Sequence, residues 1–119
     1  MPLPIQSHEP GDKTIDLGVY RTPQAIVLSG RSRGESIRQK LELNDEDKKP
    51  TAVQIIVPED ILSLNSSFFL GLFDKSIQNL GVAKFEEKYH FVCTPLIQED
   101  VEKGKKEAIN TSSPLVPKR

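Results

Sequence analysis

Residues 63–69 (SLNSSFF) carry the side chains best suited to a function, because they join a strand-like segment to an amphipathic helix. Asn65 or Ser66 can cap that helix, since a short side-chain oxygen accepts hydrogen bonds from the free N–H groups of the first turn. Ser66 and Ser67 would then stand where these N–H groups and the helix dipole favour negative charge. A phosphate there would add about −1.5 to −2 charges. The segment therefore predicts either a plain helix cap or a phosphorylation switch.

Three arginines lie in and after the turn-rich segment 29–34 (SGRSRG). Arg31, Arg33 and Arg38 would flank the N-terminus of a predicted helix over 35–43, where an anion can bind. A solvated turn explains the same residues. Residues 30–34 also match the G-x-S-x-G motif of α/β-hydrolases, but the chain is too short for that fold and His90 is the sole later histidine.

The remaining reactive side chains do not predict a catalytic or metal site. His90 and Cys93 are three residues apart, but a structural zinc ion needs four ligands and His8 falls in a predicted tail. Acid pairs such as Glu59 and Asp60 lie in turn-like segments, where solvated carboxylates are normal. We therefore expect a protein that is not an enzyme and uses neither a metal nor a cofactor.

Composition limits the domain count and the class of partner. The 119 residues, 36% of them hydrophobic, suffice for one hydrophobic core. With 16 basic and 17 acidic residues the chain lacks the basic excess of a nucleic-acid binder. The single cysteine favours a cytoplasmic location, and no segment is apolar enough to cross a membrane. We expect one domain over 14–110, a flexible leader over 1–13 and a flexible tail over 111–119.

Hydrophobic patterns predict an α/β domain with the order β-β-α-β-α-β-α. Apolar residues alternate over 15–20 and continue over 25–28, which indicates a β-hairpin. A β-branched run over 51–57 predicts a strand buried on both faces. Spacings of three and four predict helices over 66–80, closed by Gly81, and over 97–108, on either side of a strand at 88–93. These elements imply a mixed sheet of about four strands packed with about three helices.

The pattern over 51–92 resembles the STAS domain of anti-sigma-factor antagonists: a β-branched strand, a loop ending LNSS, a helix closed by glycine and a further strand. The segment SGRSRGESIR at 29–38 and the closing helix are more similar to divergent STAS-like domains of uncharacterised bacterial proteins. Those domains share a Gly-Glu-x-x-Arg helix start and a Ser-Ser-Phe loop, here at 34–38 and 66–68. The resemblance covers about residues 15–110.

The resemblance implies a regulatory module that binds a protein. The antagonist loop usually reads Asp-Ser-Ser-Gly, and its first serine is phosphorylated by a kinase that is also the partner. By position Asn65 replaces the aspartate, Ser66 takes the place of that serine and Phe68 replaces the glycine. We expect a partner to contact Ser63, Asn65, Ser66, Ser67 and Phe68, together with the exposed face of the following helix.

The partner that the resemblance implies is an anti-sigma factor or a related histidine-kinase-like ATPase. Two other functions fit the same residues. The first is a sensor of a small ligand or nucleotide phosphate that uses the three arginines, and the second is a structural subunit of a larger assembly.

Overall fold

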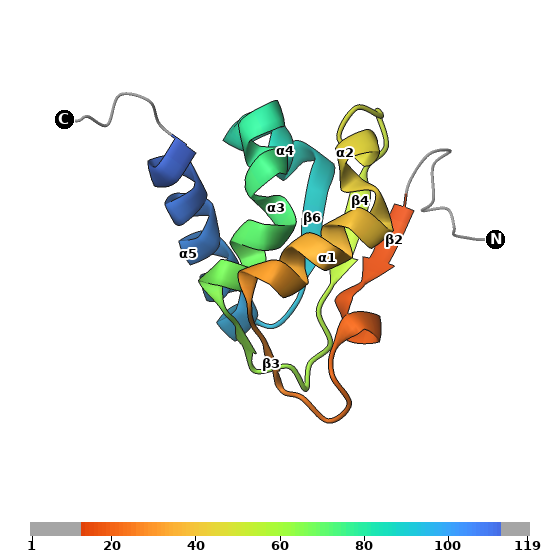
Figure 1. Ribbon diagram of the computed structural model, residues 1–119, viewed down its shortest axis with the longest axis vertical. Helices are drawn as coiled ribbons and strands as arrows, with labels where there is room; N and C mark the ends of the chain where they lie inside the picture. Colours follow the sequence, from red (N-terminus) through yellow and green to blue (C-terminus); the bar gives the residue numbers. More distant parts are fainter. Residues whose placement is uncertain (1–12, 113–119) are drawn as a thin grey trace.

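Three short parallel strands form the main sheet of the computed structural model, which describes residues 13–112 (Figure 1). They are β2 (Lys13–Asp16), β4 (Val53–Ile56) and β6 (Tyr89–Val92), in the order β2-β4-β6. Ile15 lies beside Ile55 and Ile55 beside Phe91, so apolar side chains gather on the face that packs against the helices. Gln54 and His90 are exposed on the other face. The prediction that the 51–57 strand is buried on both faces is therefore wrong.

The second sheet consists of β3 (Val27–Leu28) and β5 (Ser63–Leu64), which are also parallel. The predicted hairpin over 15–28 is wrong, because β2 runs into a 3-10 helix, η1 (Leu17–Tyr20), and β3 pairs with β5 instead. Asp16 Oδ1 accepts from the N–H of Gly18 at 2.8 Å, and this cap turns the chain out of the strand. Every strand pair within 13–112 is parallel, so the expected mixed sheet is also wrong.

Five α-helices accompany the strands within the described residues. The predicted helices correspond to α1 (Arg31–Leu41), α3 (Ser66–Leu80) and α5 (Pro95–Ser112). Two short helices were not predicted, α2 (Leu43–Glu46) and α4 (Val82–Lys88). The α5 stripe of Ile97, Val101, Gly104 and Ala108 is buried, as predicted. None of the helices within 13–112 has both the length and the apolar character to cross a lipid bilayer.

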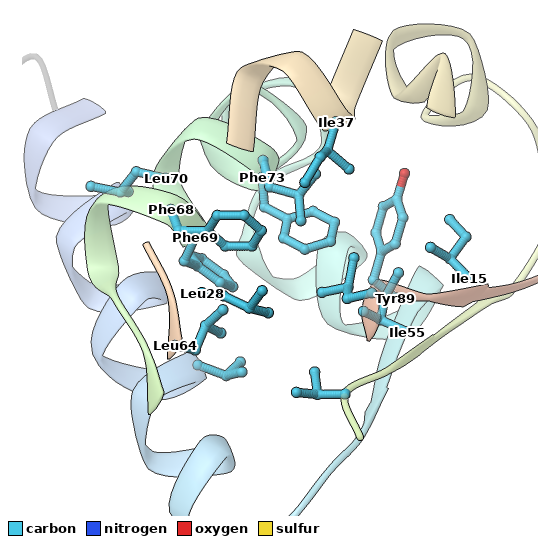
Figure 2. Packing of buried hydrophobic residues seen from close by; sticks show 14 of the residues in the cluster. Ile15, Leu28, Ile37, Ile55, Leu64, Phe68, Phe69, Leu70, Phe73 and Tyr89 are labelled. Carbon is cyan, nitrogen blue, oxygen red and sulfur yellow. The ribbon is translucent and has the colours of Figure 1, made fainter. Parts of the chain in front are cut away.

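Helix α3 lies between α1 and α5, and its aromatic side chains fill the space above the sheet (Figures 1 and 2). Phe69 and Phe73 of α3, and Phe85 of α4, are at most 1% exposed. The ring centroids of Phe69 and Phe73 are 5.4 Å apart and those of Phe73 and Phe85 are 5.3 Å apart. Ring pairs at this spacing add to the stability that burial provides.

Two glycines let α1 and α3 touch through their backbones. A Cβ atom on Gly34 would collide with the carbonyl oxygen of Phe68, and one on Gly71 with the carbonyl oxygen of Arg31. Neither collision can be relieved by rotating a side chain, since the obstructing atoms belong to the backbone. The N-terminal half of α1 is therefore held directly against α3.

We predict that Gly71→Ala destabilises the protein by about 1–3 kcal/mol, the usual cost of overfilling a packed contact. Free energies of unfolding from urea denaturation measure the effect. Ser36→Ala, at an exposed position on α1, is the control and should change stability little. Alanine favours helix over glycine by about 1 kcal/mol in the absence of a clash, so a Gly71→Ala protein as stable as the wild type would contradict the close contact.

Candidate functional site

Asn65, and not Ser66, caps α3. The Asn65 Oδ1 atom accepts from the N–H of Ser67 at 2.9 Å and from the Ser67 hydroxyl at 2.6 Å. Ser66 is the first residue of α3 and is half-buried. Its hydroxyl makes no hydrogen bond to any other residue that the structure describes. The cap hydrogen bonds are thus made between Asn65 and Ser67. The Ser66 hydroxyl takes no part in them and is available for other interactions.

The other residues of the 63–69 segment divide between the surface and the core. Asn65 is exposed, and Ser63 and Ser67 are half-buried. Phe68 is 0% exposed, so it does not contact a partner as predicted. The reason is the phase of α3, which turns Phe68 into the core (Figure 2), while Ser66, two residues earlier, is only half-buried. Phe68 therefore packs in the core beneath the 63–67 loop and is not part of its surface.

The face of α3 that could meet a partner is narrower than expected. Residues 68–73 are all buried, because α1 covers one side of the helix and α5 the other (Figure 1). Lys75, Gln78 and Asn79, in the C-terminal half, are exposed. A partner that reaches the Ser66 loop would therefore meet the first turn of α3 and the neighbouring elements, and little of the middle of the helix.

Those neighbouring elements bring a second helix N-terminus to the loop. Strand β3 leads into α1 and strand β5 leads into α3, and the two strands are parallel neighbours. The N–H of Asn65 donates to the carbonyl oxygen of Leu28 at 2.8 Å. Both helices consequently begin at the same end of the molecule (Figure 1).

Exposed apolar side chains lie in β3 and directly before β3 and β5, the strands that precede these helices. Ile26 is 50% exposed and Leu62 is 51% exposed, and the N–H of Leu62 donates to the carbonyl oxygen of Ile26 at 2.8 Å. Neighbouring Val27 is 43% exposed. This apolar surface was not predicted, because its residues were assigned to a hairpin and to a loop.

The three arginines predicted to bind an anion do not converge. Arg31 is exposed at the start of α1. The Arg33 Nη2 atom donates to the carbonyl oxygen of Tyr20 at 2.8 Å. Arg38 is only 5% exposed and lies two turns further along α1, facing inward. Arg38 is therefore excluded from an anion site at the helix N-terminus.

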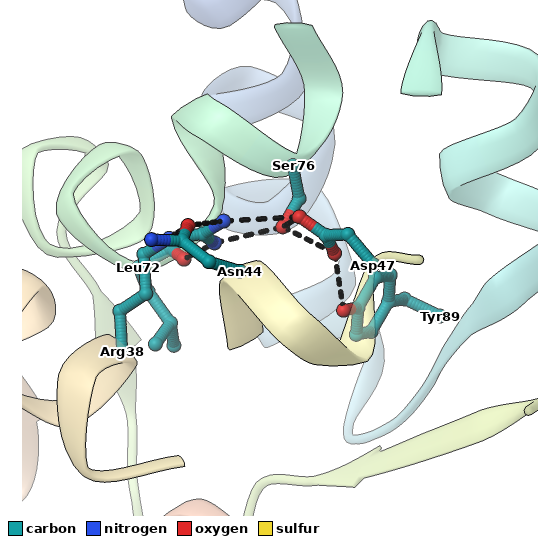
Figure 3. Close-up of polar contacts among 6 residues, drawn as sticks. All are labelled: Arg38, Asn44, Asp47, Leu72, Ser76 and Tyr89. Atoms are coloured by element: carbon teal, nitrogen blue, oxygen red, sulfur yellow. Dashed lines mark hydrogen bonds and ion pairs between the residues drawn. The ribbon is translucent and has the colours of Figure 1, made fainter. Parts of the chain in front are cut away.

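Arg38 instead occupies the centre of a buried polar network (Figure 3). Its Nε and Nη2 atoms donate to Asn44 Oδ1 at 3.2 and 2.8 Å, and Nη2 also donates to Asp47 Oδ2 at 3.0 Å. Its Nη1 atom donates to the carbonyl oxygen of Leu72 at 2.8 Å and to Ser76 Oγ at 2.7 Å. A guanidinium group has five N–H donors, and these five contacts account for all of them.

The Asp47 carboxylate is the main acceptor of this network. Ser76 Oγ lies 2.9 and 2.8 Å from the two Asp47 carboxylate oxygens, and the Tyr89 hydroxyl donates to Oδ1 at 2.6 Å. Burial, and then the hydrogen bond to the Asp47 carboxylate, raise the pKa of Tyr89 well above its ordinary value. The network joins α1, α3 and β6 to Asp47, the residue that follows α2.

A sequence signal for the network existed in the spacing of α1. Gly34, Ile37 and Leu41 follow a helical stripe, and Arg38 stands on the same stripe, one turn after Gly34. A charged residue on a buried stripe predicts a buried ionic partner. The partner itself was not predictable, because Asp47 lies in a charged segment that reads as a solvated linker.

Cys93 and His90 do not form a site. The Cys93 Sγ atom lies 3.6 Å from Gln98 Oε1, and burial raises the pKa of its thiol. His90 is exposed on the open face of the sheet. Among residues 13–112 no three or more His, Cys, Asp or Glu side chains are grouped so that they could hold a metal ion.

We predict that Tyr89→Phe weakens the loss of stability at alkaline pH. The folded protein keeps the Tyr89 proton to higher pH than the unfolded chain, whose tyrosine pKa is about 10. The resulting stabilisation is complete below about pH 10 and is lost as the pH rises further. Free energies of unfolding measured between pH 8 and about pH 11 should fall less steeply for Tyr89→Phe than for the wild type. Tyr20→Phe, outside the network, is the control, and equal slopes for wild type and Tyr89→Phe would contradict this prediction.

Comparisons with protein-family models, with curated proteins and with solved structures find no match to this chain. The resemblance to STAS-like domains therefore stays a prediction from the sequence. The local geometry around Ser66 and the buried network of Arg38 are the observations that bear on function.

Proposed function

We propose that this chain is a STAS-like regulatory module that binds a partner protein through the surface formed by Ser63, Asn65, Ser66 and Ser67, and that phosphorylation of Ser66 controls this binding. The observation that carries the proposal is the division of roles at the start of α3. Asn65 and Ser67 form the cap hydrogen bonds between them, and the hydroxyl of half-buried Ser66 has no hydrogen-bond partner among the described residues. Modification of Ser66 would therefore not break the cap.

The environment of Ser66 suits a phosphate. The positive ends of two helix dipoles lie at this end of the molecule, and each favours negative charge within its first turn. The added charge would stabilise the folded protein slightly and alter the electrostatics of the docking surface strongly. Phosphorylation of Ser66 would therefore change partner binding without unfolding the protein.

The apolar residues beside the loop extend the proposed docking surface. Ile26, Val27 and Leu62 offer exposed hydrocarbon next to the polar loop. Protein interfaces commonly combine an apolar centre with a polar rim. A partner that covers these side chains would bring its own surface close to Ser66, where a phosphate would then oppose its approach.

The partner class comes from the resemblance to anti-sigma-factor antagonists: an anti-sigma factor or a histidine-kinase-like ATPase. The alternative function, an anion sensor built on three arginines, is disfavoured by the internal hydrogen bonds of Arg33 and Arg38. The proposed role is not enzymatic. The most buried charged side chains form ion pairs that stabilise the fold.

We predict that Ser66→Asp weakens partner binding by about tenfold or more, while Ser66→Ala binds like the wild type. Affinity capture from host lysate with the three proteins as baits, followed by mass spectrometry, identifies the partner. Titration of the purified partner then gives the dissociation constants. Ser36→Asp, which adds the same charge at an exposed site on α1, is the matched control and should bind like the wild type. Equal retention by Ser66→Asp and Ser66→Ala, or equal weakening by Ser36→Asp, would refute the switch.

A further inference from the structure

Exposed apolar side chains lie at the end of the molecule where β2, β4 and β6 finish (Figure 1). Val19 is 72% exposed and belongs to η1, which directly follows β2. Val92, the last residue of β6, is 49% exposed, and Leu96, in the first turn of α5, is 53% exposed. Exposed hydrocarbon gathered in one region is typical of a surface that binds another molecule.

These side chains belong to one continuous surface. A Cβ atom on Gly18 would collide with the side chain of Pro58, so η1 lies against the loop that follows β4. The N–H of Val57 donates to the carbonyl oxygen of Val92 at 3.0 Å, which joins the same loop to the end of β6. We call this region the strand-end surface, and its exposed or half-buried apolar residues are Val19, Pro58, Val92, Pro95 and Leu96.

The strand-end surface carries a projection next to a hollow. The projection is Val19, the most exposed large apolar side chain among the described residues. The hollow has a volume of about 460 Å³ and lies between the ends of β4 and β6. The residues that line it include Ile56, Val57, Pro58, Glu59, Val92 and Pro95. A surface with a projection beside a hollow can fit a copy of itself across a two-fold axis, because each projection then meets the hollow of the other copy.

Unpaired charges of opposite sign stand on the two sides of the strand-end surface. Arg33 lies beside the projection, since its Nη2 atom donates to the carbonyl oxygen of Tyr20, the residue after Val19, at 2.8 Å. Glu59 is exposed and lines the hollow. Within residues 13–112 neither Arg33 nor Glu59 takes part in an ion pair. The cation therefore accompanies the projection and the anion accompanies the hollow.

Other charges close to this surface are already engaged within the chain. Arg21 Nη1 lies 2.9 Å from Asp60 Oδ2, and Asp16 Oδ1 accepts from the N–H of Gly18. A copy rotated by 180° would bring each Arg33 toward the Glu59 of the other chain. The charges of the surface are therefore complementary to themselves, which selects a second copy over an unrelated partner.

We propose that a second copy of this chain covers the strand-end surface in a two-fold symmetric dimer. Val19 of each copy enters the hollow of the other, and Arg33 of each copy pairs with Glu59 of the other. The inference goes beyond the proposed function and does not rest on it. A contact made by so few side chains is weaker than one of standard size, about 800 Å² per copy. We therefore expect a Kd on the order of 100 µM.

The first test measures the mass of the full chain by analytical ultracentrifugation between about 10 µM and 1 mM. Wild type should change from monomer to dimer over this range. Val19→Asp should raise the Kd at least tenfold, because a carboxylate would enter an apolar hollow. Its free energy of unfolding should stay close to that of the wild type, since Val19 is 72% exposed. Ala83→Asp, at an exposed position on α4, is the matched control and should dimerise like the wild type.

The second test exchanges the two charges. Arg33→Glu and Glu59→Arg each place like charges opposite one another, so each variant alone should dimerise about tenfold more weakly. In an equimolar mixture the two variants should form a heterodimer, because both facing pairs again have opposite charge. Native mass spectrometry separates the heterodimer from the two homodimers. Recovery in the mixture requires that Arg33 faces Glu59 across the contact.

Several outcomes would overturn the proposal. These are a wild type that stays monomeric up to about 1 mM, dimers that persist in Val19→Asp, or charge variants that dimerise no better mixed than alone. Binding of monomeric wild type, but not of Val19→Asp, to phosphatidylcholine–phosphatidylglycerol vesicles would instead assign the surface to a lipid. Ser66→Asp should dimerise like the wild type, so a failure of this proposal is separate from a failure of the Ser66 capture experiment.

Discussion

The contact on which the rest of the structure depends is the buried ion pair between Arg38 and Asp47. Their charged atoms are 3.0 Å apart, and both side chains are almost fully removed from solvent. Removal of one member of such a pair typically costs about 3–5 kcal/mol, because the other charge stays buried and unpaired. Ser76 and Tyr89 complete the coordination of Asp47, so one carboxylate connects two helices and the sheet.

A second buried acid reinforces this arrangement next to the first. Glu46 is 2% exposed and lies 3.4 Å from Lys88 Nζ and 3.5 Å from Lys13 Nζ. Lys88 Nζ also donates to the backbone carbonyl oxygens of Lys49 and Thr51. Two consecutive acids, the last residue of α2 and the one after it, thus contact different elements: Asp47 contacts α1, α3 and β6, and Glu46 contacts β2 and the end of α4. The charged segment that follows α1 therefore holds several elements together through buried ion pairs, although its composition is that of a solvated loop.

The elements that were predictable from the sequence are those whose pattern is local. Helices α3 and α5 carry long apolar stripes, and the alternation around Tyr89 gives one buried and one exposed face. Strand pairing was not predictable, because the partner of β3 lies far along the chain at β5. Helices α2 and α4 were missed because they are short, and α2 begins after Glu42, a non-glycine residue with φ of 56°.

The candidate site divides in the same way. A helix cap at Asn65 or Ser66 follows from residue type and position, and the folded chain shows that Asn65 is the cap. The burial of Phe68 follows from its position on the inward face of α3. It was not predicted because Phe68 was treated as part of the loop. The inward course of Arg38 depends on Asp47 and Ser76, which approach it only in the folded chain.

The all-parallel pairing has a consequence for the rate of folding. Lys13 pairs with Val53 and Val53 with Tyr89, so each strand contact closes a loop of about 40 residues. Domains dominated by such distant contacts fold more slowly than those built from hairpins, since loop-closure entropy is lost before the contacts form. Helix contacts between α1 and α3 span a similar distance. The chain must therefore bring together its two halves before any sheet can persist, and a nascent chain that ends before β6 lacks Tyr89, one of the groups that coordinate Asp47.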